Sequence, residues 1–229
     1  MDLPTDHLPE KPSISNAELA AHANALSAQW EMLPIDLSQS GFARRLKRLK
    51  TRLSDLLDRC RENASIHELT PQLELLESTR MLESALIAGD NTSATFSSLP
   101  RIRVEPDGDL PRTMNLAEGY LSSAGGIWSP ESLTVFVQQA QQRDALLLEE
   151  VTVLPQALKL AQLEYILDRA DEAFAAGPLP PIERSPFSAI LHSMRRLNQF
   201  EWRTVLEPLI AFDAILRQDP CGVFADMED

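Results

Sequence analysis

The segment from position 41 to position 61 constrains the fold of this 229-residue chain more than any other. Its large apolar side chains recur in steps of four and three, in the order Phe42, Leu46, Leu49, Leu53 and Leu56. Such steps place side chains on one face of an α-helix. A single apolar face with polar residues elsewhere predicts a helix that packs against other helices, as in an antiparallel bundle.

Similar patterns elsewhere predict an all-α fold, a multi-helix bundle of about seven to nine helices. Ser15 and Glu18 have capping-box spacing, and Ser129-Pro130-Glu131 has the features of a helix start. No segment has a convincing strand pattern. Further helices are expected over residues 70–89, 146–153, 155–174, 186–198 and 200–217, with Pro155 separating two of them and Pro208 bending or starting the last.

The domain organisation follows from where these patterns stop. Residues 1–14 contain three prolines and are expected to form a flexible arm. Residues 15–90 form an N-terminal helical sub-bundle, residues 91–109 a linker or long loop, and residues 110–229 a C-terminal sub-bundle. A single continuous domain, with residues 91–109 as a loop inside it, is the alternative.

Charge and cysteine content exclude several classes of protein. A formal net charge of −13 is unfavourable for nucleic acid, because binding to phosphates requires clustered positive charge. Two cysteines, Cys60 and Cys221, provide no disulfide framework and suit a reducing compartment. No apolar run has the length of a membrane span, and the first residues lack the pattern of a secretory leader.

The segment 41–61 departs from this acidic background, since it holds eight cations against two acids. A basic amphipathic helix can contact an anionic membrane surface or a partner protein. It can equally face the acidic remainder of its own fold or water, and the leucine seam favours this second interpretation. The residues for membrane or partner contact are Arg44, Arg45, Lys47, Arg48, Lys50 and Arg52.

Motifs for chemistry are missing from the sequence, which predicts no catalytic residue, no cofactor and no metal. Glu18 and His22 lie four apart on one helix face and could supply two metal ligands, but no Glu-x-x-His pairs accompany them. Gly125-Gly126 lacks the lysine of a phosphate-binding loop. Cys60 is interpreted as a half-buried structural thiol. The larger aromatics fit core positions better than a sugar-stacking site: Trp30, Trp128, Trp202, Tyr120 and Tyr165.

Four motifs in the second half occur in a distinctive order: Leu110-Pro111-Arg112, SPESLTVFVQQAQQ, VTVLPQALKLAQLEYI and ILRQDPCGVFADME. Together they resemble the N-terminal region of bacterial cyclic β-1,2-glucan synthases, with weaker similarity upstream. The matching signature positions are Pro111, Arg112, Pro155, Trp202, Arg217, Asp219, Pro220, Gly222, Phe224 and Met227. Family members usually carry Tyr at the position of Phe224 and a basic residue at that of Gln218.

The resemblance implies a large inner-membrane parent enzyme that builds β-1,2-glucan from UDP-glucose and ends in a phosphorylase-like domain. The family's catalytic residues lie beyond this region, so none is assigned here. The chain is then expected to be a truncated fragment with the natural N-terminus. It is expected at the cytoplasmic face of the bacterial inner membrane, with the other synthase domains as partners.

Three hypotheses about function follow. The first is a non-catalytic cytoplasmic module that docks against or regulates the catalytic domains of such a synthase. The second is a stand-alone helical adaptor that binds another protein. The third and least favoured is a sugar-binding domain, because no constellation of polar residues in the sequence supports one.

Overall fold

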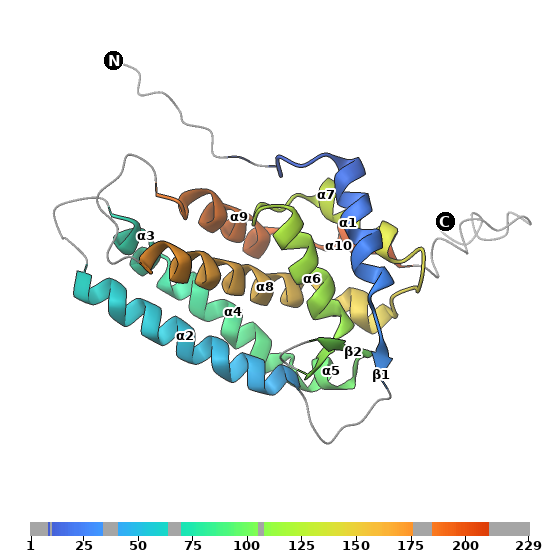
Figure 1. The fold of residues 1–229 in the computed structure, drawn as a ribbon, viewed down its shortest axis with the longest axis horizontal. Helices are drawn as coiled ribbons and strands as arrows, with labels where there is room; N and C mark the ends of the chain where they lie inside the picture. The colour runs from blue at the N-terminus through green and yellow to red at the C-terminus, as the bar shows by residue number, and fades with distance from the viewer. Residues whose placement is uncertain are drawn as a thin grey trace, which may run out of the picture.

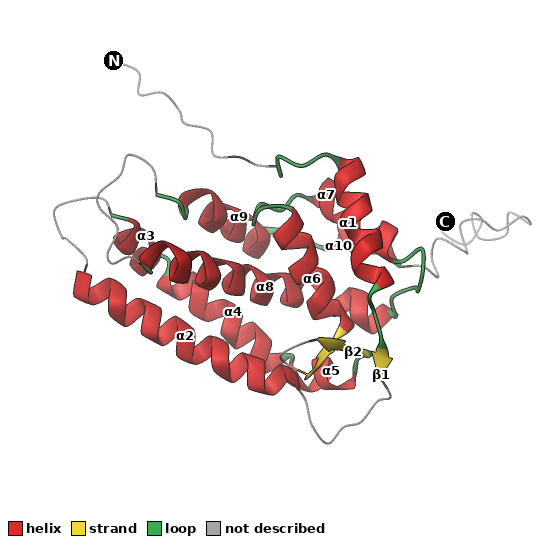
Figure 2. Ribbon diagram, viewed as in Figure 1, coloured by secondary structure: helices red, strands yellow, loops and turns green. Residues whose placement is uncertain are grey.

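The computed structural model of the chain describes residues 9, 11–33, 41–63, 70–104, 108–175 and 185–210. One long helix, α8 (Leu148–Phe174), packs against several of the other helices, and Figures 1 and 2 show their arrangement. The other helices are α1 (Asn16–Ala28), α2 (Gly41–Asn63), α3 (Pro71–Glu77), α4 (Thr79–Asn91), α5 (Ser93–Ser98), α6 (Arg112–Ser123), α7 (Pro130–Ala140), α9 (Ser188–Gln199), α10 (Arg203–Leu206) and a 3₁₀ turn, η1 (Glu207–Leu209).

The predicted all-α class is confirmed, and the seam of α2 forms part of the core. Phe42, Leu46, Leu49, Leu53 and Leu56 are each at most 5% exposed. They join one continuous cluster of buried apolar side chains that also includes residues of α1, α4, α6, α7, α8 and α9. Removing apolar surface of this extent from water is the main stabilising term of such a fold.

Local capping signals mark helix starts as predicted. Ser15 Oγ accepts the Glu18 N–H at 3.3 Å, while a Glu18 carboxylate oxygen accepts the Ser15 N–H at 3.1 Å. At α7 the Ser129 Oγ accepts the Ser132 N–H at 3.2 Å, directly ahead of Pro130. These hydrogen bonds satisfy amide donors of the first turn, which have no acceptor within the helix.

The described residues contain ten α-helices, which is more than the predicted seven to nine. One cause is the region 70–89, which divides into α3 and α4 at Ser78. Short helices such as α5 and α10 also carry too few residues to produce a periodic pattern. The predicted bend at Pro208 corresponds to η1, where the proline stands in the first turn.

Around Pro155 the prediction of two separate helices was wrong, because α8 runs through this residue. A proline within a helix removes one backbone hydrogen bond and typically costs about 3 kcal/mol. Here α8 is buried on most of its circumference, and Pro155 itself lies in the interior. Packing against α4, α6 and α9 therefore outweighs the local preference.

The expectation of no strands was also wrong. Strands β1 (Met32–Leu33), β2 (Arg101–Val104) and β3 (Gly108–Pro111) form a small antiparallel sheet in the order β1-β2-β3. Met32 pairs with Ile102, and Ile102 with Leu110. Strands of two to four residues are too short to show a two-residue alternation in sequence.

The segment 91–109, predicted as a linker or long loop, thus includes α5, β2 and the first half of β3 within its described residues. The division into two sub-bundles stays a prediction. Helix α8 packs against α2 and α4, from the predicted N-terminal part, as well as against α6 and α9 from the predicted C-terminal part. Among the described helices, none combines the length and apolar character needed to cross a bilayer.

Candidate functional site

The basic helix α2 lies along α8, and three positions of α8 carry the acids that meet it. Arg45 is buried: its Nε donates to Glu164 Oε2 at 2.9 Å, and its Nη2 lies 2.8 Å from Glu118 Oε1 of α6. Arg48 Nη2 also lies 3.8 Å from Glu164 Oε1. Arg52 Nη1 lies 4.0 Å from the same oxygen, so Glu164 stands within reach of three cations of α2, in an environment that strengthens charge–charge interactions.

Further along α2, the Arg52 Nη2 lies 2.8 Å from both Asp168 Oδ1 and Asp171 Oδ2. Arg59 Nη2 approaches the other Asp171 oxygen at 2.7 Å. Burial alone would raise the pKa of the Asp171 carboxyl, but the hydrogen bonds from Arg52 and Arg59 lower it. We call this set of pairs, from Arg45 to Arg59 on α2 and from Glu164 to Asp171 on α8, the α2–α8 charge seam.

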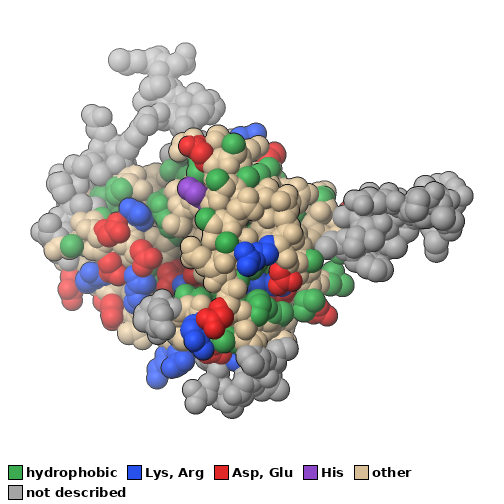
Figure 3. Space-filling model, turned by 45° about the vertical axis from the view of Figure 1, so that its right-hand side comes forward, with side chains coloured by type: hydrophobic (Ala, Val, Ile, Leu, Met, Phe, Trp, Pro, Cys, Tyr) green, Lys and Arg blue, Asp and Glu red, His purple; other side chains and the backbone are tan. Residues whose placement is uncertain are grey.

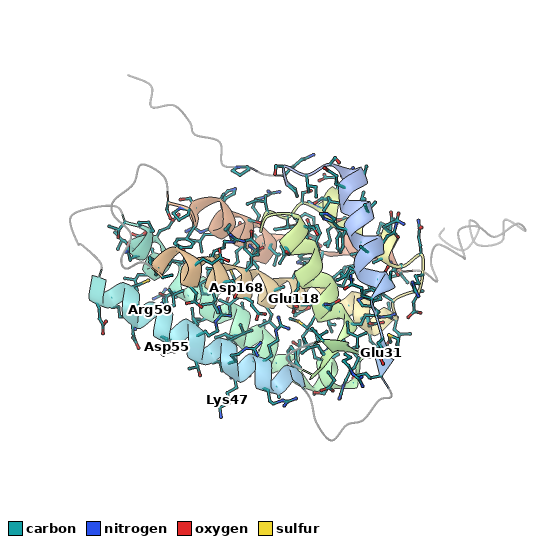
Figure 4. The ribbon with its side chains drawn as sticks, viewed as in Figure 1. Glu31, Lys47, Asp55, Arg59, Glu118 and Asp168 are labelled. Carbon is teal, nitrogen blue, oxygen red and sulfur yellow. The ribbon has the colours of Figure 1, made fainter. Side chains whose placement is uncertain are left out.

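The contact candidates outside the charge seam are Arg44, Lys47 and Lys50. Lys50 Nζ pairs with Asp90 of α4 at 2.6 Å. Arg44, Lys47 and Arg48 are exposed. Lys47 points away from the body of the protein, whereas Asp168 of α8 and Glu118 of α6 lie on the side that faces α2 (Figure 4). Cations and acids are intermixed on the face drawn in Figure 3, with no extended basic patch on it.

A hollow of about 250 Å³ opens beside the charge seam, between α6 and α8. Carboxylates and guanidinium groups of Arg45, Glu118 and Glu164 contribute to its wall. Tyr165 closes one side, and the Arg169 guanidinium lies 5.3 Å from the centre of its ring. Since the charged groups of this wall are paired with one another, their arrangement serves to join α2, α6 and α8.

The signature residue Arg112 is at the centre of a second, deeper network. Its Nε and Nη2 donate to the two Glu150 oxygens at 3.0 and 2.5 Å, and it also bonds Asp144 and the Ala145 carbonyl. The guanidinium lies 5.3 Å from the Trp30 ring centre. Burial alone lowers the pKa of Arg112, but these carboxylates raise it above its ordinary value.

Two other described signature residues, besides Pro111 in β3, also lie at contacts between elements. Pro155 is buried within α8. The Trp202 ring stacks on Trp128 at 5.3 Å between centroids, and Trp128 Nε1 donates to the Ser193 carbonyl of α9 at 2.9 Å. The remaining signature positions lie outside the described residues: Arg217, Asp219, Pro220, Gly222, Phe224 and Met227.

The thiol predicted as half-buried is more enclosed than expected, since Cys60 is 1% exposed. Burial raises the pKa of this thiol to about 11, in spite of the neighbouring Arg59 and Arg61. A thiol with such a pKa is a weak nucleophile at neutral pH. Cys221 lies outside the described residues.

Other sequence candidates are separated in space or buried. Within the described residues, no three His, Cys, Asp or Glu side chains gather in a way that could hold a metal ion. Trp128 and Tyr120 are fully buried, so neither presents a face for a sugar, while Trp30, Tyr165 and Trp202 are partly exposed at separate positions.

The acids of the charge seam were not identified from the sequence, although a signal for them exists. Glu164, Asp168 and Asp171 follow each other in steps of four and three, which is the spacing of Arg45, Arg48 and Arg52 in reverse order. Two helices with such complementary faces can pair over several turns. No protein-family model and no curated protein matches the chain.

Proposed function

We propose that this chain is a non-catalytic helical module of a cyclic β-1,2-glucan synthase-like glycosyltransferase, which docks against the catalytic domains of its parent. The observation that carries the proposal is the place of Arg112. This residue of the resembling Leu-Pro-Arg motif holds α6, the 141–147 connection and α8 together from a fully buried position. A motif residue used in this way stabilises the packing of the helices.

The other described signature residues support the same function. Pro155 is buried within α8, and Trp202 stacks on Trp128 of the connection between α6 and α7. The polar groups of the charge seam pair with one another across α2 and α8. Both features suit a rigid body that presents its outer surface to another domain.

The reading frame downstream of residue 229 provides the first test. A continuation with hydrophobic spans and a glycosyltransferase domain is expected, and an immediate stop codon would favour the stand-alone adaptor instead. A second test expresses residues 1–229 separately from the rest of the parent. Co-purification of the two parts is expected, and glucan synthesis should fall when residues 1–229 are omitted and recover when they are added back.

We also propose that the exposed end of α2 contacts the anionic cytoplasmic face of the inner membrane. The contact would use the exposed cations Arg44 and Lys47, near the start of α2. Each cation near an anionic surface is worth about 1 kcal/mol. Sedimentation with phosphatidylserine vesicles at low salt is expected to fall sharply in Arg44→Glu/Lys47→Glu.

The matched control for this test is Arg143→Glu/Arg203→Glu, which changes the charge equally at exposed positions away from α2. Equal loss in both double variants would show a response to net charge alone, and the membrane contact would then be rejected. Absence of sedimentation in the unmodified protein would reject it as well.

A further inference from the structure

An open hollow of about 610 Å³ lies where the junction of α3 and α4 approaches α9. Both α4 and α9 also pack against α8, so its two walls are held by the same central helix. The lining side chains are polar with one exception, Met81.

Two guanidinium groups, from Arg80 of α4 and Arg195 of α9, face this hollow from separate helices. Both side chains are exposed, and neither forms an ion pair with a carboxylate within the described residues. Glu77 is the one acid of the lining, which leaves a positive balance in a chain of net charge −13. Planar guanidinium groups bind phosphate and carboxylate oxygens through paired hydrogen bonds.

Ser78 stands at the base of the hollow and forms the N-cap of the 13-residue helix α4. It is 3% exposed, it makes no side-chain capping bond, and its Oγ has no hydrogen-bond partner within the described residues. Buried hydroxyl groups without a partner are rare in folded proteins. The Met81 amide of this turn donates to the Ser78 carbonyl at 3.0 Å, so the Ser78 hydroxyl is the group that is left to meet a ligand.

We propose that this hollow binds a phosphate group, held between the Arg80 and Arg195 guanidinium groups with the Ser78 hydroxyl beneath it. The inference goes beyond the proposed docking function and does not depend on it. Phosphate is favoured over carboxylate because two guanidinium groups on opposite walls match an anion that carries close to two charges. A soluble phosphate and a phosphomonoester lipid headgroup present the same chemistry.

The test titrates the full chain with inorganic phosphate at low ionic strength and follows binding by calorimetry or by amide chemical shifts. Saturable binding is expected, and Arg80→Gln and Arg195→Gln should each weaken it at least tenfold. Arg143→Gln, an exposed arginine outside the hollow, is the matched control and should bind like the unmodified protein. Ser78→Ala should weaken phosphate binding while leaving the unfolding midpoint unchanged or higher.

Vesicles that contain phosphatidic acid distinguish the two sources. If free phosphate binds and such vesicles do not, the ligand is a soluble phosphate. Vesicle binding that is lost in Arg80→Gln and Arg195→Gln identifies a headgroup. The proposal is overturned if neither probe shows saturable binding. It is overturned equally by binding that Arg80→Gln and Arg195→Gln leave unchanged, or that Arg143→Gln reduces to the same degree.

Discussion

Arg112 and Glu150 form a two-point ion pair in the interior, with Nε–Oε1 and Nη2–Oε2 distances of 3.0 and 2.5 Å. Glu150 is fully buried and also accepts the Leu147 N–H at 2.9 Å, so that it caps the first turn of α8. Arg112 begins α6, and the pair therefore connects the starts of two helices that lie 36 positions apart in the sequence. A fully bonded buried pair of this kind specifies one arrangement of the elements it joins.

Arg112→Met is expected to reduce the free energy of unfolding by about 3–5 kcal/mol, because it leaves the Glu150 charge buried without its partner. Urea denaturation followed by circular dichroism measures the change. The double variant Arg112→Met/Glu150→Met should recover part of the loss, since it removes both charges. Arg143→Met, at an exposed position, should change stability by less than about 0.5 kcal/mol. An Arg112→Met protein as stable as this control would contradict the structural role.

Cys60 is expected to resist thiol reagents while the protein is folded. With a pKa of about 11, the thiolate amounts to about 0.1% at pH 8, compared with about 25% for an ordinary cysteine. The measurement follows reaction with a chromogenic disulfide in a Cys221→Ser background, so that Cys60 alone reports. Labelling should be slow in buffer and rapid in denaturing urea. Rapid labelling without urea would show that the thiol is accessible.

Tyr120 makes the protein sensitive to alkali. Its hydroxyl lies 2.7 Å from the Ser132 Oγ, and burial raises the pKa of this phenol to about 12. The unfolded state loses the same proton near pH 10, so the folded state binds it more tightly. The resulting stabilisation is present below pH 10 and is lost as the pH rises through 12.

Tyr120→Phe, which has no such proton, provides the comparison for this pH dependence. The stability of the unmodified protein relative to Tyr120→Phe should fall by about 2–3 kcal/mol between pH 9 and pH 12. Other alkaline groups, such as Cys60, are present in both proteins and cancel in the difference. A constant difference over this range would show that the phenol has an ordinary pKa.

Gly126 is expected to tolerate alanine much less well than its neighbour Gly125. Both have a left-handed backbone, with φ of +75° and +63°, which costs an alanine about 1 kcal/mol. A Cβ at Gly126 would lie 2.5 Å from Tyr165 Cε1, whereas one at Gly125 would meet no atom within 4 Å. Gly126→Ala should therefore lower the thermal midpoint clearly more than Gly125→Ala. Equal shifts would mean that Tyr165 moves aside without cost.

Most of the helical structure could be predicted from the sequence. The capping residues Ser15 and Ser129 act on amides three positions away, and the seam of α2 depends on a repeat that is visible within one helix. The continuity of α8 could not be predicted in this way. Pro155 is unfavourable locally, and only the neighbours that bury α8 on most sides compensate for it.

The candidate contact residues show the same limit. Sequence alone identified α2 as basic, but it did not show that Arg45 is buried against Glu164 while Lys47 points outward. The hollow between Arg80 and Arg195 was not expected either, because its two arginines are 115 positions apart and neither belongs to a motif.

By itself, the sequence determined where the longer helices lie, that α1 and α7 begin at capping residues and which face of α2 is apolar, because these properties arise between residues a few positions apart. The tertiary structure alone decided that α2 neutralises the acids of α8, that Arg112 meets Glu150, and that three short strands pair. Each of these contacts joins groups that are distant in the sequence and that folding brings together. A charge or a backbone amide that loses its water in the interior requires a specific hydrogen-bond partner.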